Sequence, residues 1–478
     1  MKNMTLGNIA AACGGIYHGT EAAKEKTIAE ITTDSRKAGK DSLFVAIKGE
    51  RVDAHKFIPA VFEQGALCVI SEQELEAPAG AYIQVDSSLQ AIKDIAEFYR
   101  KQLDIKVVGI TGSVGKTSTK EMIASVLSEK YRVLKTLGNF NNELGLPLTV
   151  FRLREEDEIA VLEMGISHFG EMHRLSKIAR PDICVITNIG QCHLEFLGDR
   201  DGVLKAKSEI FDYLAPDGTI VLNGDDDKLV TLQEVEGIQP VFFGIDSDRM
   251  ISATQIHSLG LKGIACRICT GQGDFDVTIP IPGYHMVYNA LAGTAVGLSL
   301  GMTTEEIKRG IEKLESLSGR FHIIETDNYT VVDDCYNANP VSMKASLKVL
   351  GDALGRKVAI LGDMGELGEN EQQLHEEVGV AAGQQGIQML ICVGALSEGM
   401  AKAAKETNPQ MEVIHKQTLE EAISSLPQYL KQGDTILVKA SHFMHFEKIV
   451  EVLTKQEYKE DKNMKKRILS SIALGLAL

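Results

Sequence analysis

Short apolar runs rich in β-branched residues alternate with segments of helical periodicity along most of the chain. The clearest pair lies near residue 105, where Ile105 to Thr111 predicts a buried strand and the pattern from about Ser118 to Lys130 predicts a helix. Further runs of strand length follow at 158–165, 182–190 and 218–225. Such alternation predicts a parallel sheet with right-handed helical crossovers.

The flanking regions carry different patterns. Before residue 101 the elements are shorter, and strands at 43–47 and 67–70 around a helix at 57–64 predict a small mixed α/β domain. From about 241 to 281 short strands follow one another without helices, which predicts an antiparallel appendage, and a helix is expected at 284–300. A second alternating series begins near residue 321, with strands expected at 330–334, 357–361, 389–393 and 435–439.

A glycine-rich turn joins the strand near residue 105 to its helix. Glycines let the backbone approach an anion, and free N–H groups at the start of a helix point toward it. Lys116 is expected to reach the β- and γ-phosphates of a nucleotide, and the Thr117 hydroxyl to ligate Mg²⁺. The common P-loop pattern has a glycine where this chain has Ile110, so the match is to a shorter form. The alternative is a turn that binds nothing. The predicted ATP-binding residues are Gly112, Ser113, Val114, Gly115, Lys116, Thr117 and Ser118.

These patterns predict an α/β fold of three domains, which agrees with about three domains expected for 478 residues. A small mixed α/β N-terminal domain occupies 1–100. A central P-loop parallel-sheet ATPase domain occupies 101–320, and a C-terminal Rossmann-like domain 321–457. The tail, 458–478, has a basic start and an apolar run too short to span a bilayer. We expect it to be dispensable, with a weak membrane-surface anchor as the alternative.

Composition narrows the classes of partner and compartment. The formal net charge of −16 argues against general nucleic-acid binding, which needs a basic face. No stretch of about 18 apolar residues predicts a membrane span. Eight cysteines without framework spacing, and no N-terminal signal pattern, predict reduced thiols and a cytoplasmic location. Nothing in the pattern indicates an obligate oligomer, and a monomer is expected.

Polar side chains follow the strands of the central domain. Glu163, Asn188 and His193 stand at or just beyond strand ends, where ligands of parallel sheets bind. Alone, Glu163 is explained as a helix cap and His193 as a structural histidine. Their joint position in a P-loop sheet favours metal binding.

Several stretches resemble the Mur ligase family, the ATP-dependent amide-forming enzymes of peptidoglycan precursor synthesis. Besides the short P-loop, they are Thr32-Thr-Asp-Ser-Arg36 with 43–49, Leu162-Glu-Met-Gly165, Asn188-Ile-Gly-Gln-Cys-His-Leu-Glu195 and Gly319-Arg320. Three more resemble the member that joins D-alanyl-D-alanine to UDP-N-acetylmuramoyl-tripeptide. They are Gly138 to Pro147, Asp333 to Pro340, and Gly362 to Gly368 with His375. The resemblance keeps its order from about residue 30 to 455.

The resemblance implies a reaction through an acyl phosphate. ATP phosphorylates the tripeptide carboxylate, the amine of D-alanyl-D-alanine attacks, and phosphate leaves. Two anions meet, so the site needs concentrated positive charge. The resemblance implies that Lys116 and two Mg²⁺ ions supply it, the first ion on Thr117 and Glu163. The second lies near His193 and a carbamylated lysine.

The carbamylated lysine has two candidates in Lys205-Ala-Lys-Ser208. Addition of CO₂ to a neutral lysine amine gives an anion with two oxygen ligands. Physical reasoning does not choose between Lys205 and Lys207, and either is also explained as a solvated helix residue. The resemblance favours Lys207. The predicted catalytic residues are therefore Lys116, Glu163, His193 and Lys207.

The resemblance also implies the other ligand contacts. Asn289 and Arg320 contact the nucleotide from the central domain, and Asp334 and Asn337 contact its ribose and adenine from the C-terminal domain. ATP then lies across a domain boundary, and closure assembles the site. The loop 362–368 and His375 shape the dipeptide side. The UDP-muramoyl peptide is contacted by Asp34, Ser35, Arg36, Asn139, Asn141 and Asn142.

Two departures and two alternatives remain. Family members commonly carry Ser-Arg where this chain has Ser441-His442, so an anion contact made by the family's arginine is in doubt here. They also commonly carry His-Asn-Val where this chain has His285-Met-Val287. The first alternative function is the sister ligase that adds the third, diamino acid residue. The second is a P-loop nucleotide switch, which needs no amino acceptor. The sequence does not indicate whether the tripeptide ends in lysine or diaminopimelate.

Overall fold

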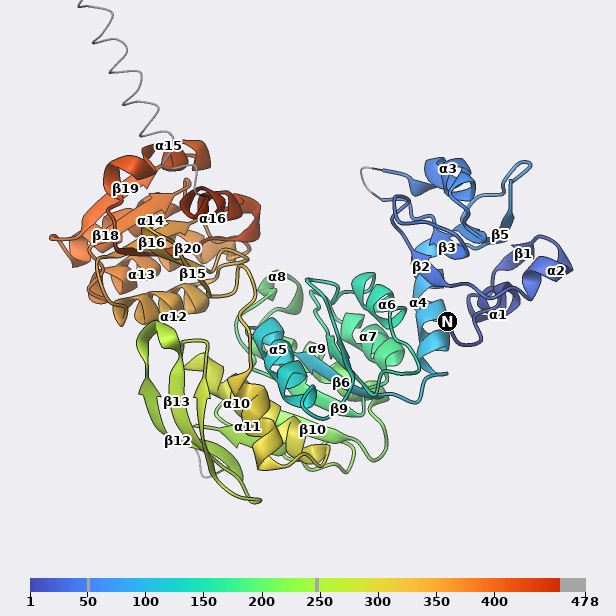
Figure 1. Ribbon diagram of the computed structural model, residues 1–478, viewed down its shortest axis with the longest axis horizontal. Helices are drawn as coiled ribbons and strands as arrows, with labels where there is room; N and C mark the ends of the chain where they lie inside the picture. The colour runs from blue at the N-terminus through green and yellow to red at the C-terminus, as the bar shows by residue number, and fades with distance from the viewer. Residues whose placement is uncertain (50–51, 246–248, 456–478) are drawn as a thin grey trace, which may run out of the picture. The chain divides into compact units, whose positions relative to one another are not determined.

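The computed structural model describes residues 1–49, 52–245 and 249–455. The strands form three sheets, each built from one continuous stretch of the sequence (Figure 1). By their contacts the residues group into two compact units. The first holds 1–254, 267–277 and 288–313, and the second holds 255–266, 278–287 and the residues from 314. The predicted tail lies outside the described residues. In the part of the chain that is described, no helix is long and apolar enough to cross a membrane.

The N-terminal sheet has the strand order β1-β5-β4-β3-β2, with β1 antiparallel to β5 and the other neighbours parallel. The predicted strands at 43–47 and 67–70 are β3 and β4, and the predicted helix at 57–64 is α3. Its elements are α1 (Leu6–Ala12), β1 (Ile16–His18), α2 (Glu21–Lys24), β2 (Glu30–Thr32), β3 (Ser42–Val45), η1 (Ala54–Phe57), α3 (Ile58–Glu63), β4 (Cys68–Ser71), β5 (Ala81–Gln84) and α4 (Ser88–Arg100).

The second sheet has nine strands in the order β14-β13-β12-β11-β10-β9-β6-β8-β7. All of its described pairings from β7 to β12 are parallel, as predicted for the central domain. Its strands are β6 (Lys106–Thr111), β7 (Val133–Lys135), β8 (Ile159–Glu163), β9 (Ile183–Ile186), β10 (Thr219–Asn223), β11 (Val241–Gly244), β12 (Ile251–Ser258), β13 (Ile264–Cys269) and β14 (Phe275–Ile279). Its helices are α5 (Lys116–Leu127), α6 (Gly145–Val150), α7 (Glu171–Ala179), α8 (Leu194–Leu197), α9 (Arg200–Ser208), η2 (Glu209–Tyr213), η3 (Leu229–Thr231), η4 (Gly260–Lys262), α10 (His285–Ser299) and α11 (Thr304–Glu312).

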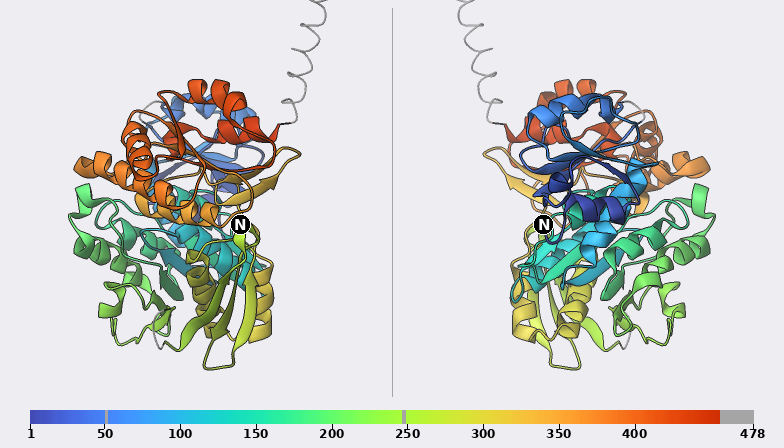
Figure 2. Two further views of the ribbon diagram at one scale, coloured as in Figure 1. Left: turned by 90° about the vertical axis from the view of Figure 1, so that its left-hand side faces the viewer. Right: turned by 90° about the vertical axis from the view of Figure 1, so that its right-hand side faces the viewer.

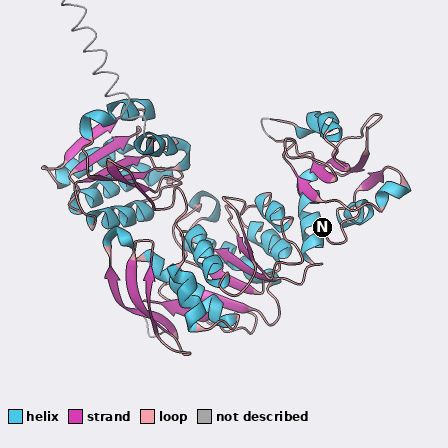
Figure 3. Cartoon of the chain, in the orientation of Figure 1, coloured by secondary structure: helices cyan, strands magenta, loops and turns pink. Residues whose placement is uncertain are grey.

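The prediction of an antiparallel appendage at 241–281 is wrong at its beginning. Figure 3 shows the strands of this region side by side, and β11 pairs in parallel with both β10 and β12. The prediction rested on the lack of helices between these short strands, because parallel neighbours ordinarily need a long crossover connection. The parallel pairing of β11 with β12 covers only two register positions, Phe243↔Ile251 and Gly244↔Ser252. An alternating hydrophobic pattern reports which face of a strand is buried, and the same alternation fits a parallel or an antiparallel neighbour.

The C-terminal sheet has the order β15-β16-β20-β17-β18-β19 and is parallel except for the edge pair β15–β16. Orange and red helices lie on both sides of its strands, as in a doubly wound fold (Figures 1 and 2). The four predicted strands are present, and β15 and β19 add to them. The elements are β15 (His322–Glu325), β16 (Tyr329–Asp333), α12 (Pro340–Gly351), β17 (Lys357–Gly362), η5 (Gly368–Asn370), α13 (Glu371–Gln384), β18 (Met389–Val393), α14 (Ser397–Thr407), β19 (Glu412–Lys416), α15 (Leu419–Tyr429), β20 (Asp434–Lys439), η6 (His442–Met444) and α16 (Glu447–Thr454).

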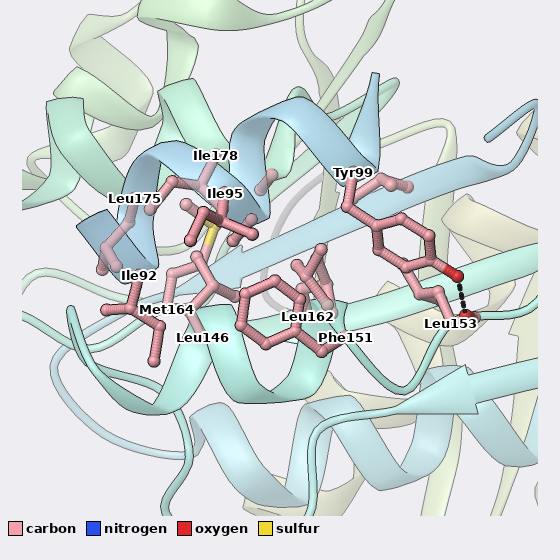
Figure 4. Packing of buried hydrophobic residues seen from close by; sticks show 14 of the residues in the cluster. Ile92, Ile95, Tyr99, Leu146, Phe151, Leu153, Leu162, Met164, Leu175 and Ile178 are labelled. Carbon is pink, nitrogen blue, oxygen red and sulfur yellow. Dashed lines mark hydrogen bonds between the residues drawn. The ribbon is translucent and has the colours of Figure 1, made fainter. Parts of the chain in front are cut away.

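Helix α4 packs against the central sheet's helices although it follows the N-terminal strands. Its apolar face, Ile92, Ile95 and Tyr99, lies in one buried cluster with side chains of α6, α7 and β8 (Figure 4). The Tyr99 hydroxyl donates to the Leu153 carbonyl at 2.6 Å. The buried Arg100 guanidinium donates to three carbonyls, those of Leu103, Ile105 and Ala179. The end of α4 is thereby fixed to the start of β6, which carries the P-loop.

Candidate active site

The predicted phosphate cradle has the expected strand–turn–helix form. β6 ends at Thr111, and α5 begins at Lys116 after Gly115, which caps the helix with a left-handed φ of 84°. Gly112 has a φ of 152°, and a Cβ there would overlap the Thr187 hydroxyl. Only glycine suits this close approach. The Lys116 ammonium lies 2.9 Å from the Gly112 carbonyl, so its charge stands over the turn.

A second loop, Thr187 to Gly190, holds the cradle in shape. The Asn188 amide donates to the Val114 carbonyl and accepts from the Val114 N–H, both at 2.9 Å. The Gly190 N–H donates to the Ser113 hydroxyl at 2.8 Å. Asn188, expected at a strand end, therefore supports the P-loop backbone. Ile189 is held in turn, because Asp226 accepts its N–H and Arg200 donates to its carbonyl.

Glu163, at the end of β8, combines burial with one unpaired oxygen. The residue is 2% exposed. Its Oε1 accepts from the Thr117 hydroxyl at 3.3 Å and from the Asn141 amide at 2.9 Å. Its Oε2 is buried and has no hydrogen-bond partner among the residues that the structure describes. A buried carboxylate oxygen without a partner is costly, and a divalent cation bound beside Thr117 would satisfy it. The oxygen donors of Thr117 and Glu163 fit Mg²⁺, which prefers such ligands.

The structure separates the two candidate lysines, although both lie on α9. Lys207 is 1% exposed, and no hydrogen bond or ion pair is recorded for it among the described residues. Burial, followed by repulsion from Lys116, lowers the pKa of Lys207 to about 7. Lys205 is exposed, with its ammonium 5.8 Å from the Phe169 ring centre. Lys207 alone therefore has an environment that favours a neutral amine near pH 7.

His193 stands in the same unit as these groups. It is half-buried, adopts a left-handed φ of 51° and immediately precedes α8. Among the described residues no group of three or more His, Cys, Asp or Glu side chains is arranged to hold a metal. The predicted ligand set is of another kind, because it draws on a threonine hydroxyl and a lysine as well as on Glu163 and His193.

The three asparagines of the loop 138–147 have different partners. Asn141 donates to the Glu163 carboxylate, and its carbonyl accepts from the Gly165 N–H at 2.8 Å. The Asn142 side chain accepts from the N–H groups of Leu144 and Gly145, so it orders the start of α6. Asn139 is exposed. The support of Glu163 by Asn141 could not be predicted from local sequence, because the two residues are 22 positions apart.

Two further predicted contacts of the first unit have partners within the chain. The Arg36 guanidinium makes two bonds of 2.8 Å to Asp34, which lower the pKa of that carboxyl to about 2, while the arginine side chain stays 87% exposed. The neighbouring Ser35 is half-buried. A phosphate binding at Arg36 would compete with Asp34. Asn289, on α10, is 6% exposed and accepts from the Thr119 hydroxyl of the P-loop helix at 2.8 Å.

The predicted residues of the second unit lie at the carboxyl ends of its parallel strands. Asp334 is buried; it pairs with Lys439 at 2.7 Å and accepts from Ser346 and from a backbone N–H. The Arg320 guanidinium lies 4.1 Å from the centre of the Tyr336 ring. The His442 ring stacks on Tyr336, with 5.5 Å between the ring centres. Asn337 is exposed. The ribose and adenine contacts stay predictions.

The loop 362–368 is fixed from two sides. His375 is fully buried; its Nε2 accepts from the Met364 N–H at 2.9 Å and its Nδ1 faces the Glu371 carbonyl at 2.7 Å. The Ser441 hydroxyl accepts from the Gly365 N–H at 2.9 Å. His375 therefore supports the loop from within, and any contact with a dipeptide would come from the loop.

Comparison with protein-family models finds matches to a single family along most of the chain. Three family models match successive segments: "Mur ligase family, catalytic domain" at 27–100, "Mur ligase middle domain" at 110–297 and "Mur ligase, glutamate ligase domain" at 319–442. Each match covers most of the strands of one sheet, and together the matches confirm the α/β fold of three domains.

Relatives and solved structures agree with these matches. The chain is 37% identical over 458 residues to UDP-N-acetylmuramoyl-tripeptide–D-alanyl-D-alanine ligase of Bacillus subtilis, covering 95% of this chain and 99% of that protein. The Escherichia coli enzyme of that name is also 37% identical, over 84% of this chain and 89% of its own length. A MurF crystal structure from Acinetobacter baumannii matches with a TM-score of 0.84 at 35% identity, over 94% of this chain and 98% of that one. MurF from Thermotoga maritima, solved in complex with ADP, matches with a TM-score of 0.79 at 29% identity, over 90% and 98%. The buried Glu163 carboxylate beside a short P-loop agrees with these matches. Because three family models match in succession and the Bacillus subtilis relative covers 95% of the chain, this chain belongs to the Mur ligase family.

Proposed function

We propose that this chain joins D-alanyl-D-alanine to the carboxylate of UDP-N-acetylmuramoyl-tripeptide, converting ATP to ADP and phosphate. It is thus an ATP-dependent, ADP-forming ligase that makes the pentapeptide precursor of peptidoglycan. The observation that carries the proposal is the Glu163 carboxylate, buried beside Thr117 with one oxygen unpaired. The Bacillus subtilis and Escherichia coli relatives, which cover 95% and 84% of this chain, act, by their names, on these two substrates.

The residues of the first unit supply the steps of phosphoryl transfer. The backbone N–H groups of Gly115, Lys116 and Thr117 bind and orient the phosphates. Those of Ser113 and Val114 donate to Asn188 and hold the turn in shape. Lys116 exchanges the Gly112 carbonyl for a phosphate oxygen, and its charge offsets the repulsion between ATP and the tripeptide carboxylate. Thr117 and Glu163 would hold one Mg²⁺, and His193 and Lys207 a second. Bound Mg²⁺ would neutralise charge on the transferred phosphoryl group.

The carbamylation of Lys207 is a finer part of this proposal. Its burial, its pKa of about 7 and the lack of a recorded bonding partner among the described residues support an amine that is neutral enough to add CO₂. We expect Lys207→Ala to lose activity and Lys205→Ala to keep it. Carbon-13 NMR of protein exposed to labelled CO₂ should show a carbamate signal that Lys207→Ala removes. Near-normal rates for both variants, or a wild-type protein without the signal, would refute the assignment.

The remaining contacts are proposed from the resemblance. Asp34, Ser35 and Arg36 meet the UDP part, while Asn139, Asn141 and Asn142 face the muramoyl peptide. Asn289 contacts the nucleotide from the first unit. Arg320, Asp334 and Asn337, which all belong to the second unit, are proposed as further nucleotide contacts. The proposed boundaries are 1–100, 101–320 and 321–457, in line with three separate sheets. A cytoplasmic location is supported by eight cysteines that form no disulfide.

The test is phosphate release from ATP and Mg²⁺ with UDP-tripeptide, with and without D-alanyl-D-alanine. Release that requires the dipeptide, with the pentapeptide product seen by mass spectrometry, is expected. Release that requires a free diamino acid and the UDP-dipeptide would assign the sister ligase instead. Release indifferent to every acceptor would indicate a nucleotide switch.

A further inference from the structure

Lys120 is a buried lysine on the P-loop helix that phosphoryl transfer does not use. It stands four residues after Lys116, and so lies one turn below it on the same face of α5. The residue is 1% exposed and is among the largest fully buried side chains of the molecule. A lysine ammonium is almost never fully buried unless its charge and its hydrogen bonds are satisfied. Its partners therefore indicate what it holds in place.

The Lys120 ammonium has two partners of different kinds. It donates to the Thr136 carbonyl at 2.7 Å and forms an ion pair with Glu121 at 2.9 Å. Glu121 is itself shared, because the half-exposed Lys135 binds its other oxygen. Glu121 thus balances the charge of two lysines, and only Lys120 reaches the Thr136 backbone.

Thr136 connects this buried charge to the candidate metal ligand. It is fully buried just after β7, and its N–H bonds to Val161 of β8. Its hydroxyl accepts the Glu163 N–H at 3.0 Å. The chain then turns through Leu137 and returns at Asn141, which donates to the Glu163 carboxylate. The residue that Lys120 holds by its carbonyl therefore positions Glu163, both directly and through this loop.

We propose that Lys120 is a positioning residue for the Glu163 carboxylate, and through it for the divalent cation of the nucleotide site. The inference rests on the proposed function only in that this site binds a divalent cation with nucleotide. A charged donor on the Thr136 carbonyl fixes the end of β7 and the loop after it. Outer contacts of this kind typically change metal affinity or activity about 10- to 100-fold when they are removed.

The test compares two lysines of one ion cluster. Lys120→Met keeps the volume and removes the bond to Thr136. The matched control, Lys135→Met, removes the other cation from Glu121 and leaves Thr136 untouched. Mn²⁺ binding to the full chain in the presence of ADP is measured by electron paramagnetic resonance, and folding by circular dichroism. We expect Lys120→Met to weaken Mn²⁺ binding about 10- to 100-fold and Lys135→Met to change it less than about threefold.

A second variant keeps the proposal falsifiable if Lys120→Met does not fold. Thr136→Val removes only the hydroxyl that accepts from Glu163 and should weaken Mn²⁺ binding in the same direction. Lys120→Arg, which keeps a charged donor, should restore part of the affinity. A folded Lys120→Met that binds Mn²⁺ like the wild type overturns the proposal, as does an equal loss in Lys135→Met or unchanged binding in Thr136→Val. Failure of acceptor-dependent phosphate release, with Mn²⁺ binding as expected here, would overturn the proposed function and leave this inference standing.

Discussion

The P-loop region and the strand ends of the C-terminal sheet differ in how completely the protein satisfies its own buried charges. Beside the P-loop, Glu163 keeps a buried oxygen without a hydrogen bond, and Lys207 is buried with no recorded hydrogen bond or ion pair among the described residues. At the ends of β16 and β20, Asp334 is also buried, but Lys439, Ser346 and a backbone N–H satisfy it. Both regions were expected to touch the nucleotide. Each region buries a carboxylate and a lysine, but these charges are paired with each other only in the C-terminal sheet.

The difference separates groups prepared for a ligand from groups that hold the fold. A buried polar group left unpaired lowers the stability of the free protein and gains a partner only when a ligand arrives. A buried charge that pairs with another residue of the chain helps to hold the folded unit together. Removing it leaves the partner buried without a counter-charge, which lowers the free energy of unfolding. Substitutions in the two regions should therefore trade activity against stability in opposite directions.

The largest effect is expected for Glu163→Gln. Loss of the charged metal ligand should lower kcat/KM by about 1,000-fold, which is about 4 kcal/mol. The thermal unfolding temperature of the ligand-free protein should stay equal or rise, because the unpaired charged oxygen is gone. Ligase assays and calorimetric unfolding measure the two quantities. A variant that loses stability and keeps its rate would place Glu163 with Asp334.

Lys207 gives a pH-dependent form of the same test. Its folded pKa of about 7 lies below the value of an unfolded lysine, about 10.4. The unfolded state therefore holds more protons between these values, and stability rises with pH across that window. Relative to Lys207→Met, the ligand-free wild type should gain a few kcal/mol between pH 7 and pH 10. Urea unfolding at a series of pH values measures this, and parallel curves for the two proteins would contradict it.

Asp334→Ala should destabilise the ligand-free protein by about 3 kcal/mol, because it leaves Lys439 buried without its partner. The matched control is Asp334→Ala combined with Lys439→Met, which removes both charges and should recover part of the loss. Unfolding by urea is the measurement. Wild-type stability in the single variant would show that the pair of Asp334 with Lys439 does not stabilise the unit.

The smallest effect is expected at Asn337, which is exposed and close in sequence to Asp334. Asn337→Ala should change the free energy of unfolding by less than about 0.5 kcal/mol. If it contacts adenine or ribose as proposed, the KM for ATP should rise several-fold, about 1 kcal/mol for one hydrogen bond. An unchanged KM for ATP would remove Asn337 from the nucleotide site.

Much of the fold could be predicted because its strands are buried and its turns carry glycine. The runs that became β6, β8, β9 and β10 are apolar on both faces, as strands of a covered parallel sheet must be. Edge strands lack that signal. β15 and β19 are only partly buried, and neither has a continuous apolar run. Strand direction in the 241–281 region was equally hidden, since alternation is the same for parallel and antiparallel pairs.

The candidate site was predictable where one local motif carries it and hidden where distant segments meet. The P-loop turn could be predicted from the glycines at 112 and 115. The choice of Lys207 over Lys205 needed either the resemblance or the burial that only the fold supplies. The roles of Asn141, Thr136 and Lys120 around Glu163 depend on pairings between residues 16 to 27 positions apart. No single stretch of sequence contains such a pairing.

The anchoring of α4 bears on how this protein can exchange parts with its relatives. Because Tyr99 and Arg100 bond to carbonyls around the central sheet, the last helix of the N-terminal stretch is energetically part of the next body. A chimera joined at residue 100 would place a foreign α4 against the native α6 and α7 and disturb the buried apolar seam between α4 and these two helices. A crossover before Ser87, which caps α4, keeps that seam intact. Recombination among ligases of this kind should therefore favour junctions upstream of α4, so that the unit of inheritance is the helix together with the P-loop that follows it.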